Sequence, residues 1–229
     1  MTKKGSSTLT ILSAGNFTGP VSISGGSIYA GNNCFASVSS ITITNDGTLD
    51  LGGGTFSGKK PITISGNGVN GSGAINNSYD DYPVQSVSIT LTGDATLGAS
   101  KRWDIAAGSF IGGPHSLIMD LTGATYSEWN STTIGSNVVN IVLTNGNFGA
   151  KSMSSSFQNP GTMFTVSPNR QLYFWGNGDG WNGSIHLLNG AQIQHFGAPA
   201  GFNGSNIILE TGADFVSYGN TNADAATPC

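Results

Sequence analysis

The sequence predicts an all-β chain that folds as a single parallel β-helix, or β-solenoid, of about nine to ten rungs. One motif recurs: two apolar residues spaced by two, a turn rich in Gly, Asn, Asp or Thr, and a second apolar strand. With 35 Gly among 229 residues and 9% charged residues, the composition also favours turns and strands. The repeat has a nearly constant period of roughly 20–23 residues, which is typical of a solenoid. The second apolar residue of each copy marks the repeat, and two of the intervals between successive markers are longer, at 27 and 30 residues. The markers are Ile23, Ile43, Ile64, Leu91, Leu121, Leu143, Val166, Leu187 and Leu209.

A solenoid explains this spacing better than a sandwich or a barrel does. Strands of those folds are joined by tight hairpins every ~8–12 residues, whereas here an equivalent strand returns only after a full rung. Equivalent strands of successive rungs then stack in parallel, ~4.8 Å apart, and bury a continuous core. Within one strand, alternation places Ile41 and Ile43 inside and Thr42 and Thr44 outside.

The rungs are expected to cover about residues 8–218 of a single domain, residues 1–229, with a frayed tail at 219–229. The two long steps predict loop insertions near residues 70–85 and 100–116, because extra residues in a solenoid leave its body as loops. No segment has the pattern of a helix. The expected strand pairs, in chain order, lie at 21–28, 41–49, 62–69, 89–97, 119–126, 141–148, 164–172, 185–193 and 207–215.

Charge and hydropathy exclude several functions. The chain has eight Lys and Arg against twelve Asp and Glu, for a formal net charge of -4. Eight cations are too few to follow a phosphate backbone, so nucleic acid is not an expected partner. No run of 18 apolar residues occurs, so this segment is not expected to insert into a membrane. The Gly-x-Gly strings precede no helix and predict turns rather than phosphate sites, so no cofactor is expected.

Candidate catalytic residues are few and scattered. An enzyme of this fold that acts on polysaccharides needs carboxylates, with or without Lys or Arg, that converge on one face. Asp80 and Asp81 lie in the first expected insertion, where a solvated loop is the simpler interpretation. Arg102 and Asp104 alternate onto one face and are expected to form a surface ion pair of little stabilising value. No catalytic residue is therefore predicted, and an enzyme is the least favoured class.

Neither a metal site nor a disulfide is predicted. The loop around Asp179 lacks the repeated ligand positions of a calcium loop, and a turn is the better interpretation. Cys34 belongs near the first rungs and Cys229 to the tail, so both are expected to be free, reactive thiols. The histidines lie in three different contexts without a shared carboxylate: His115, His186 and His195.

One aromatic column is the candidate binding surface. Three late rungs carry an aromatic residue followed by Gly, and these residues are Trp175, Phe196 and Tyr218. The steps between them match the period of the rung, so the rings should stack in one column. If the strand continues to these residues, its alternation points the rings outward, as an apolar strip suited to sugar rings. If the chain turns a corner before them, the rings point into the core, where aromatic residues usually pack. The solvent exposure of the Trp175 and Tyr218 side chains distinguishes the outward orientation from the inward one.

Residues 3–28, KKGSSTLTILSAGNFTGPVSISGGSI, resemble the autotransporter-associated β-strand repeat, also called the passenger-associated transport repeat. Residues 46–105 also look like the stretches that flank such repeats. The resemblance implies a right-handed β-helix in a secreted or surface-displayed bacterial protein, as a fragment of a longer passenger, without catalytic residues. It is carried by Lys3, Gly5, Leu9, Ile11, Phe17, Thr18, Gly19, Ile23, Gly26 and Ile28, with departures at Ser7, Leu12 and Ser13.

The expected function is therefore structural: a stalk or passenger segment that presents or forms an adhesive surface. A glycan-binding adhesin module is the alternative, with glycans or host and cell-surface components as partners. Because cutting a solenoid exposes an apolar cross-section and unpaired strand edges, self-association through the ends of the rod is also expected.

Overall fold

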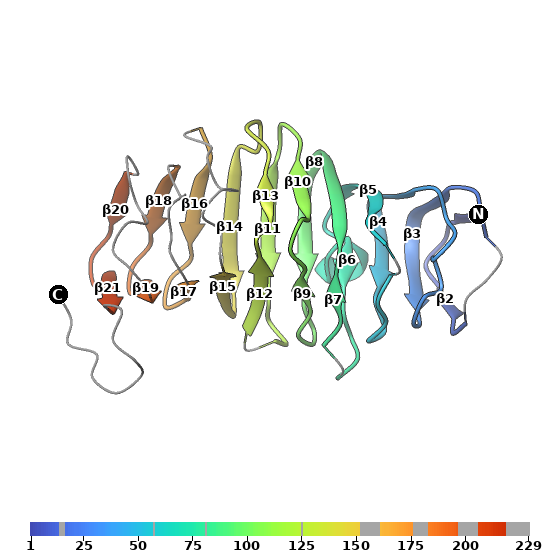
Figure 1. Ribbon diagram of the computed structural model, residues 1–229, viewed down its shortest axis with the longest axis horizontal. Coiled ribbons are helices and arrows are strands. Elements are labelled where there is room, and N and C mark those ends of the chain that lie inside the picture. The colour runs from blue at the N-terminus through green and yellow to red at the C-terminus, as the bar shows by residue number, and fades with distance from the viewer. Residues whose placement is uncertain are drawn as a thin grey trace.

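A computed structural model describes residues 1–13, 17–56, 58–80, 82–124, 126–151, 161–175, 183–196 and 206–218. It confirms an all-β solenoid, with 55% strand and 2% helix, whose parallel strands stack in about eight turns. The turns follow one another along the long axis, with β2 near one end and β21 near the other (Figure 1). The expected tail at 219–229 lies outside the described residues.

Two parallel sheets contain the strands of the described residues. The first holds fourteen strands: β1 (Thr2–Lys3), β2 (Thr8–Ile11), β3 (Val21–Ala30), β4 (Ile41–Asp50), β5 (Lys60–Gly66), β6 (Ile75–Asn76), β8 (Val87–Gly98), β10 (Phe110–Gly112), β11 (Ser116–Asp120), β13 (Thr133–Ile134), β14 (Asn140–Asn145), β16 (Met163–Val166), β18 (Ser184–Leu187) and β20 (Ile207–Leu209). The second holds seven: β7 (Val84–Gln85), β9 (Asp104–Ile105), β12 (Tyr126–Asn130), β15 (Asn147–Lys151), β17 (Gln171–Trp175), β19 (Gln192–Phe196) and β21 (Asp214–Tyr218).

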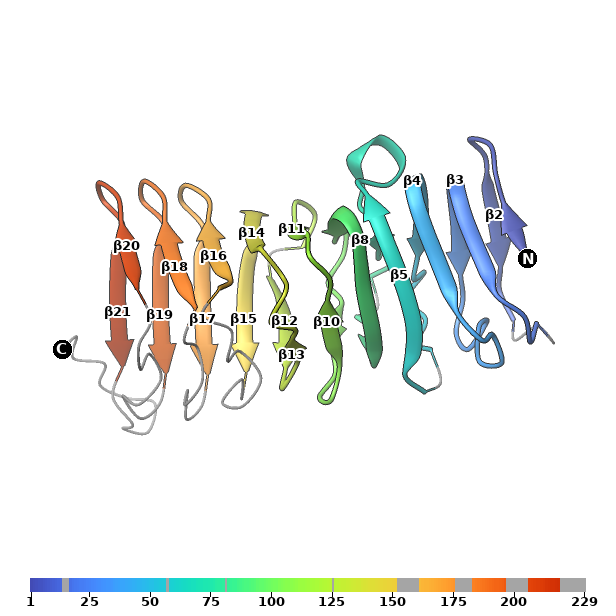
Figure 2. The same cartoon turned by 90° about the horizontal axis from the view of Figure 1, so that it is seen from above.

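A complete turn has three sides. The first sheet supplies two of them, because the long strand β8 pairs with β10 through its first half and with β11 through its second half. The second sheet is the third side, which we call side three, and its strands β15, β17, β19 and β21 run in the same direction (Figure 2). Among the described residues, one column of the first sheet contains ten strands, from β2 to β20. The nine copies of the motif are spread over two columns, because the first four lie on one side of the turn and the last four on the next, so the nine to ten expected rungs correspond to about eight turns.

The expected insertion at 100–116 is not an insertion. This segment carries β9 and β10, which pair in parallel with strands of the neighbouring turns. Ile89 pairs with Ile111 and Leu97 with Met119, so the spacing here is that of an ordinary turn. The apparent long step arose because the repeated motif moved from one side of the turn to the next side along the chain.

The first long step is a true insertion, but it begins earlier than predicted. Ile64 pairs with Leu91 and Leu49 with Ile75, and both steps are long, so the extra residues lie between Ile64 and Ile75. They include a 3₁₀ helix, Val69–Gly71. The Val69 amide donates to Thr48 Oγ1 at 2.8 Å, and Thr48 Oγ1 donates to the Gly73 carbonyl at 2.9 Å. The insertion therefore folds back onto the outside of the sheet.

The core is continuous along the stack, as the alternation predicts. Inward residues such as Ile41 and Ile43 are fully buried, and the corresponding residues of adjacent turns pack on one another. Trp129 and Phe148, from adjacent turns, meet edge to face with ring centroids 4.9 Å apart. Because each turn buries only part of its apolar surface by itself, this stacking supplies most of the stabilisation.

Candidate functional site

Side three carries on its outer face a continuous row of six aromatic side chains and one arginine. Seven side chains from six turns follow one another along the rod, each in contact with the next. We call this row the aromatic strip, and it consists of Tyr82, Arg102, Tyr126, Tyr173, Trp175, Phe196 and Tyr218.

The strip ends in the column that the sequence predicts. Trp175 pairs with Phe196, and Phe196 with Tyr218, in the register of β17, β19 and β21. The side chains point outward, because Leu172 and Phe174, which alternate with them, are buried. Trp175 is 38% exposed, and Tyr218 is partly exposed. Of the two alternatives, the outward orientation is the one found; the glycine after each ring lies outside the described residues.

The rings of this column stack face to face. Ring centroids of Trp175 and Phe196 are 4.5 Å apart with planes 14° apart, and those of Phe196 and Tyr218 are 4.8 Å apart with planes 10° apart. Both faces of Phe196 are therefore covered by its neighbours. The column presents mainly ring edges to solvent, and a stacking sugar would need the remaining face of Trp175 or another ring of the strip.

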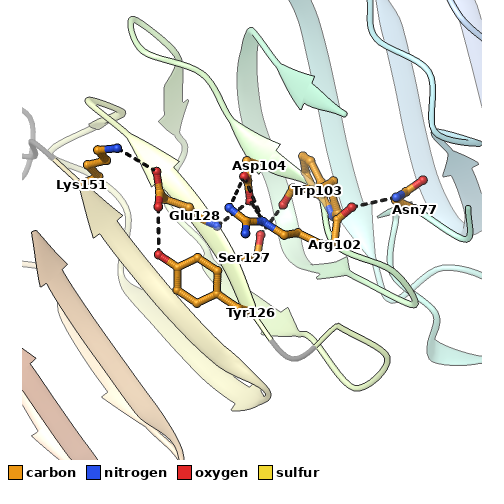
Figure 3. A network of polar contacts seen from close by, with 8 residues as sticks. All are labelled: Asn77, Arg102, Trp103, Asp104, Tyr126, Ser127, Glu128 and Lys151. Atoms are coloured by element: carbon orange, nitrogen blue, oxygen red, sulfur yellow. Dashed lines mark hydrogen bonds and ion pairs between the residues drawn. The ribbon is translucent and has the colours of Figure 1, made fainter. Parts of the chain in front are cut away.

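The other half of the strip is built around Arg102 (Figure 3). Its guanidinium lies 5.1 Å from the ring centroid of Tyr82 and 4.8 Å from that of Tyr126. The same group donates to both carboxylate oxygens of Asp104, with the shortest contact 2.7 Å from Nη2 to Oδ2. These hydrogen bonds raise the pKa of Arg102 above its ordinary value. Arg102 thus joins two tyrosine rings into one surface.

The pair of Arg102 and Asp104 is more than the loose surface ion pair that was expected. The Asp104 side chain is only 11% exposed. Its Oδ1 also accepts a hydrogen bond from the Glu128 amide of the next turn, at 2.8 Å. Trp103, which lies between Arg102 and Asp104 in the sequence, points into the core, and its Nε1 donates to the Gly98 carbonyl at 2.8 Å. A bidentate pair with a largely buried carboxylate orients the guanidinium, which is itself 38% exposed.

Tyr126 links this cluster to the following turns. Its hydroxyl donates to Glu128 Oε2 at 2.9 Å, while Glu128 Oε1 lies 3.9 Å from Lys151 Nζ (Figure 3). Burial, and then the carboxylate of Glu128, raise the pKa of Tyr126 well above its ordinary value of 10. The ring reaches over Gly149 to meet Tyr173 edge-on, at 5.9 Å between centroids. Only a residue without a side chain leaves room for it.

The sequence identified three of the six aromatic members of the strip. Tyr82, Tyr126 and Tyr173 were missed because they meet across turns at unequal positions rather than in one repeated column. The signal was indirect: Gly149 interrupts the outward positions of β15, between Tyr126 of β12 and Tyr173 of β17. An outward glycine between two tyrosines of flanking turns indicates that a ring crosses it.

Chemically, the strip offers apolar edges and faces next to hydrogen-bonding groups whose charges are paired. Side-chain amides border the aromatic column: Gln171 Nε2 donates to Gln192 Oε1 at 3.1 Å. Asp104 and Glu128 occupy adjacent turns, and each is held by hydrogen bonds with neighbouring groups. This arrangement suits recognition of an uncharged, hydroxyl-rich surface, which ring contacts and amide hydrogen bonds satisfy together.

The other candidate groups lie apart from the strip or from one another. Asp80 forms an exposed ion pair with Lys101 at 2.5 Å, and Asp81 and Asp179 lie outside the described residues. Two histidines have carboxylate neighbours that the sequence did not reveal: His186 Nε2 lies 2.9 Å from Glu210 Oε1, and His115 Nδ1 lies 3.9 Å from Asp94 Oδ1. His195 is buried on the inward side, and burial lowers its pKa.

Among the described residues, no three His, Cys, Asp or Glu side chains come together as a metal site. No helix in this part of the chain has the length and hydropathy of a membrane span. Cys34 is a free thiol, as predicted, but it is fully buried and its Sγ donates to the Ile11 carbonyl at 2.9 Å. The expectation that it is reactive is therefore wrong. Cys229 lies outside the described residues.

The chain was compared with protein-family models, curated proteins and solved structures, and none of them matches it. The resemblance of residues 3–28 to the autotransporter-associated repeat therefore stays a prediction.

Proposed function

We propose that this chain is a structural rod that presents the aromatic strip to solvent as an adhesive surface. The observation that carries the proposal is the uninterrupted parallel stack with its continuous core. Each turn is held by the turns before and after it, so a solenoid extends in length without a change in cross-section. On the resemblance of residues 3–28, we place this rod in a secreted or surface-displayed bacterial protein.

A structural rod should tolerate the loss of a whole turn. Deleting residues 98–119 joins Leu97 to Asp120 and removes one full turn, which ends at Met119, the partner of Leu97. The shortened chain should keep a β-rich circular dichroism spectrum and cooperative unfolding, because the columns stay in register. Deleting residues 98–108, half as many, should destroy the fold because inward and outward residues change sides.

The outcome of this pair of deletions decides the proposal. A folded full-turn deletion beside an unfolded half-turn deletion supports a modular rod. Equal disruption by both would show that the turn at 98–119 is unique rather than one of a series, and would contradict a purely structural role.

The second candidate is a glycan-binding module, and the observation that favours it is the aromatic strip. Tyr82 is 59% exposed and Trp175 is 38% exposed, although both lie in defined ring contacts. Exposed rings fixed by neighbours lose little conformational freedom on binding. The charges around them are paired, so a neutral, linear oligosaccharide lying along the rod is the ligand that fits.

A glycan array with three variants tests this candidate. Tyr82→Ala and Trp175→Ala should each weaken binding of any neutral glycan that the parent chain captures. Phe17→Ala is the matched control, because Phe17 is 38% exposed and lies outside the strip. Equal weakening by all three variants, or no glycan captured by the parent chain, would contradict the glycan-binding role.

A further inference from the structure

A groove follows the corner of the rod between the first sheet and side three. It consists of two adjoining hollows of about 330 Å³ and about 390 Å³, which share Thr122 and Gly123. Ser72 of the insertion borders one end of the groove, and Arg170 borders the other. The lining comes from the corners after β8, β11, β14 and β16, in four successive turns. At ~4.8 Å per turn the groove is roughly 14 Å long, which suits a short oligomer.

Arg170 is the unusual member of this lining. Its main chain is fixed, because its amide donates to the Ser167 carbonyl at 3.2 Å and its carbonyl accepts from the Gln192 amide at 2.9 Å. Arg170 is partly buried, and its Nε atom is buried without a hydrogen-bond partner. A buried N–H group is normally satisfied by an acceptor, and the hollow beside Arg170 gives an acceptor from outside the chain room to approach.

Most other basic side chains have an acceptor within the protein. Six of them contact a carboxylate or a main-chain carbonyl: Lys3, Lys59, Lys60, Lys101, Arg102 and Lys151. Within the described residues, this leaves Arg170 and the solvent-exposed Lys4 without such a partner. Of these two, Arg170 lines the groove.

The rest of the lining is polar and carries one carboxylate, that of Asp120. Its Oδ1 accepts from the Thr122 amide and from Asn145 Nδ2, each at 3.1 Å, and from the Thr122 hydroxyl. None of these contacts uses Oδ2, which can therefore accept a hydrogen bond from a hydroxyl group of a ligand. Asn147 Oδ1 accepts from the Gln171 amide at 3.2 Å, so its Nδ2 is the group that can donate to a ligand.

We propose that this groove binds an acidic oligosaccharide, with a sugar carboxylate on Arg170 and sugar hydroxyl groups on Asp120 and Asn147. The planar guanidinium matches a carboxylate through two parallel hydrogen bonds. A single cation with Asp120 in the same groove favours a singly charged carboxylate over a phosphate dianion, because like charges repel. Among the described residues that line the groove, only two alanines have apolar side chains, so a hydroxyl-rich ligand fits better than an apolar peptide.

The groove shares no residue with the aromatic strip. This site is therefore independent of the neutral-glycan role considered for the strip, and it goes beyond the structural role of the rod.

Isothermal titration calorimetry of the full chain with defined trisaccharides tests the site. Trigalacturonate carries its carboxylates within the chain and 3′-sialyllactose carries one at its end, so these probes distinguish the two sources of a sugar carboxylate. Binding of either probe supports the proposal. Methyl-esterified trigalacturonate should bind about tenfold more weakly than trigalacturonate, or less, because the ester has lost the charge that pairs with Arg170.

Variants of the basic residues show whether Arg170 holds the carboxylate. Arg170→Gln should lower the affinity for the acidic probe about tenfold or more, and Arg170→Lys should lower it less, because Lys keeps the charge and loses the bidentate geometry. Lys4→Gln is the matched control, because it removes an exposed cation outside the groove, and it should leave the affinity unchanged. Trp175→Ala, in the aromatic strip, should leave it unchanged as well. Circular dichroism of every variant checks that the solenoid is intact.

The outcomes separate this site from the aromatic strip. A parent chain that binds an acidic probe and captures no neutral glycan would support the groove and contradict the glycan-binding role of the strip. A parent chain that binds neither acidic probe, an equal affinity for the methyl ester, or an equal loss with Lys4→Gln would each overturn the proposal. Loss with Trp175→Ala but not with Arg170→Gln would overturn it too, because the acidic sugar would then lie on the strip.

Discussion

Replacing Gly149 with Ala should disrupt the aromatic strip, because Gly149 lies directly under the ring of Tyr126. A Cβ atom at this position would lie 1.9 Å from Tyr126 Oη and 2.6 Å from Tyr126 Cζ, so the tyrosine ring has to move away. The displaced ring would lose its hydrogen bond to Glu128 and its contacts with Tyr173 and Arg102. The main chain of Gly149 lies in a strand, so the substitution tests the space above it rather than backbone strain.

The size of the effect follows from these contacts. A hydrogen bond to a charged group contributes ~1.5–3 kcal/mol, an edge-to-face aromatic pair ~0.5–1.5 kcal/mol, and an exposed cation–π contact ~0.5–1 kcal/mol. Water replaces part of the hydrogen bond at this half-buried site, and the terms are not additive. We therefore expect a net loss of about 2 kcal/mol, which lowers Tm by about 4–8 °C.

A double-mutant cycle by urea denaturation separates this cause from a general effect of the added methyl group. In a Tyr126→Ala background, Gly149→Ala should cost almost nothing, because no ring remains above it. Gly19→Ala is the control, since a Cβ there meets no atom within 4 Å. An equal cost of Gly149→Ala with and without the Tyr126 ring would refute the reasoning.

Three further results are expected. Trp129→Ala should destabilise the fold by ~3–5 kcal/mol, because it removes a fully packed ring. Val139→Ala, at an exposed site, should change the unfolding free energy by less than ~0.5 kcal/mol. Equal losses for the two variants in urea denaturation would contradict the core assignment. Cys34 should react with a maleimide only as fast as the protein opens, because burial shields the thiol and raises its pKa; rapid labelling of native protein at Cys34, mapped by mass spectrometry, would oppose this. Burial lowers the pKa of His195 below that in the unfolded chain, so stability should be complete above the unfolded pKa of ~6.5 and fall as the pH drops below it. A His195→Gln variant should show a smaller fall in Tm over that range, and an unchanged fall would exclude this histidine as the cause.

The parallel stack and the inward residues were predictable from the sequence because both depend on periodicity. Alternation along the strand assigns Ile41 and Ile43 to the core, and a nearly constant rung length brings equivalent strands together. The three sides of the turn were not predictable in the same way. Adjacent sides carry the same apolar pattern, so Leu91 and Leu121 were taken as equivalent although they lie on different sides.

The aromatic strip was likewise predictable only where it depends on the periodicity of the turn. Trp175, Phe196 and Tyr218 share one position of the turn, so spacing alone placed them in a column. They face outward because β17, β19 and β21 continue as strands as far as these residues, and the length of a strand is not set by the periodicity of the turn. Tyr126 reaches Tyr173 across an intervening turn, and only the three-dimensional register of β12, β15 and β17 shows it.

Disulfide formation between outward residues tests the central claim of parallel, stacked turns most directly. Thr42 pairs with Thr63, and Thr63 with Thr90, in successive turns, so neighbours are ~4.8 Å apart and Thr42 and Thr90 about twice that. Three double variants are made in a background with Cys34→Ala and Cys229→Ala. Thr42→Cys with Thr63→Cys, and Thr63→Cys with Thr90→Cys, should each form a disulfide in the folded protein. Thr42→Cys with Thr90→Cys exceeds the limit of ~7 Å between Cα atoms and should stay reduced. Ready linkage of 42/90, or no linkage of either neighbouring pair, would contradict the stacked solenoid.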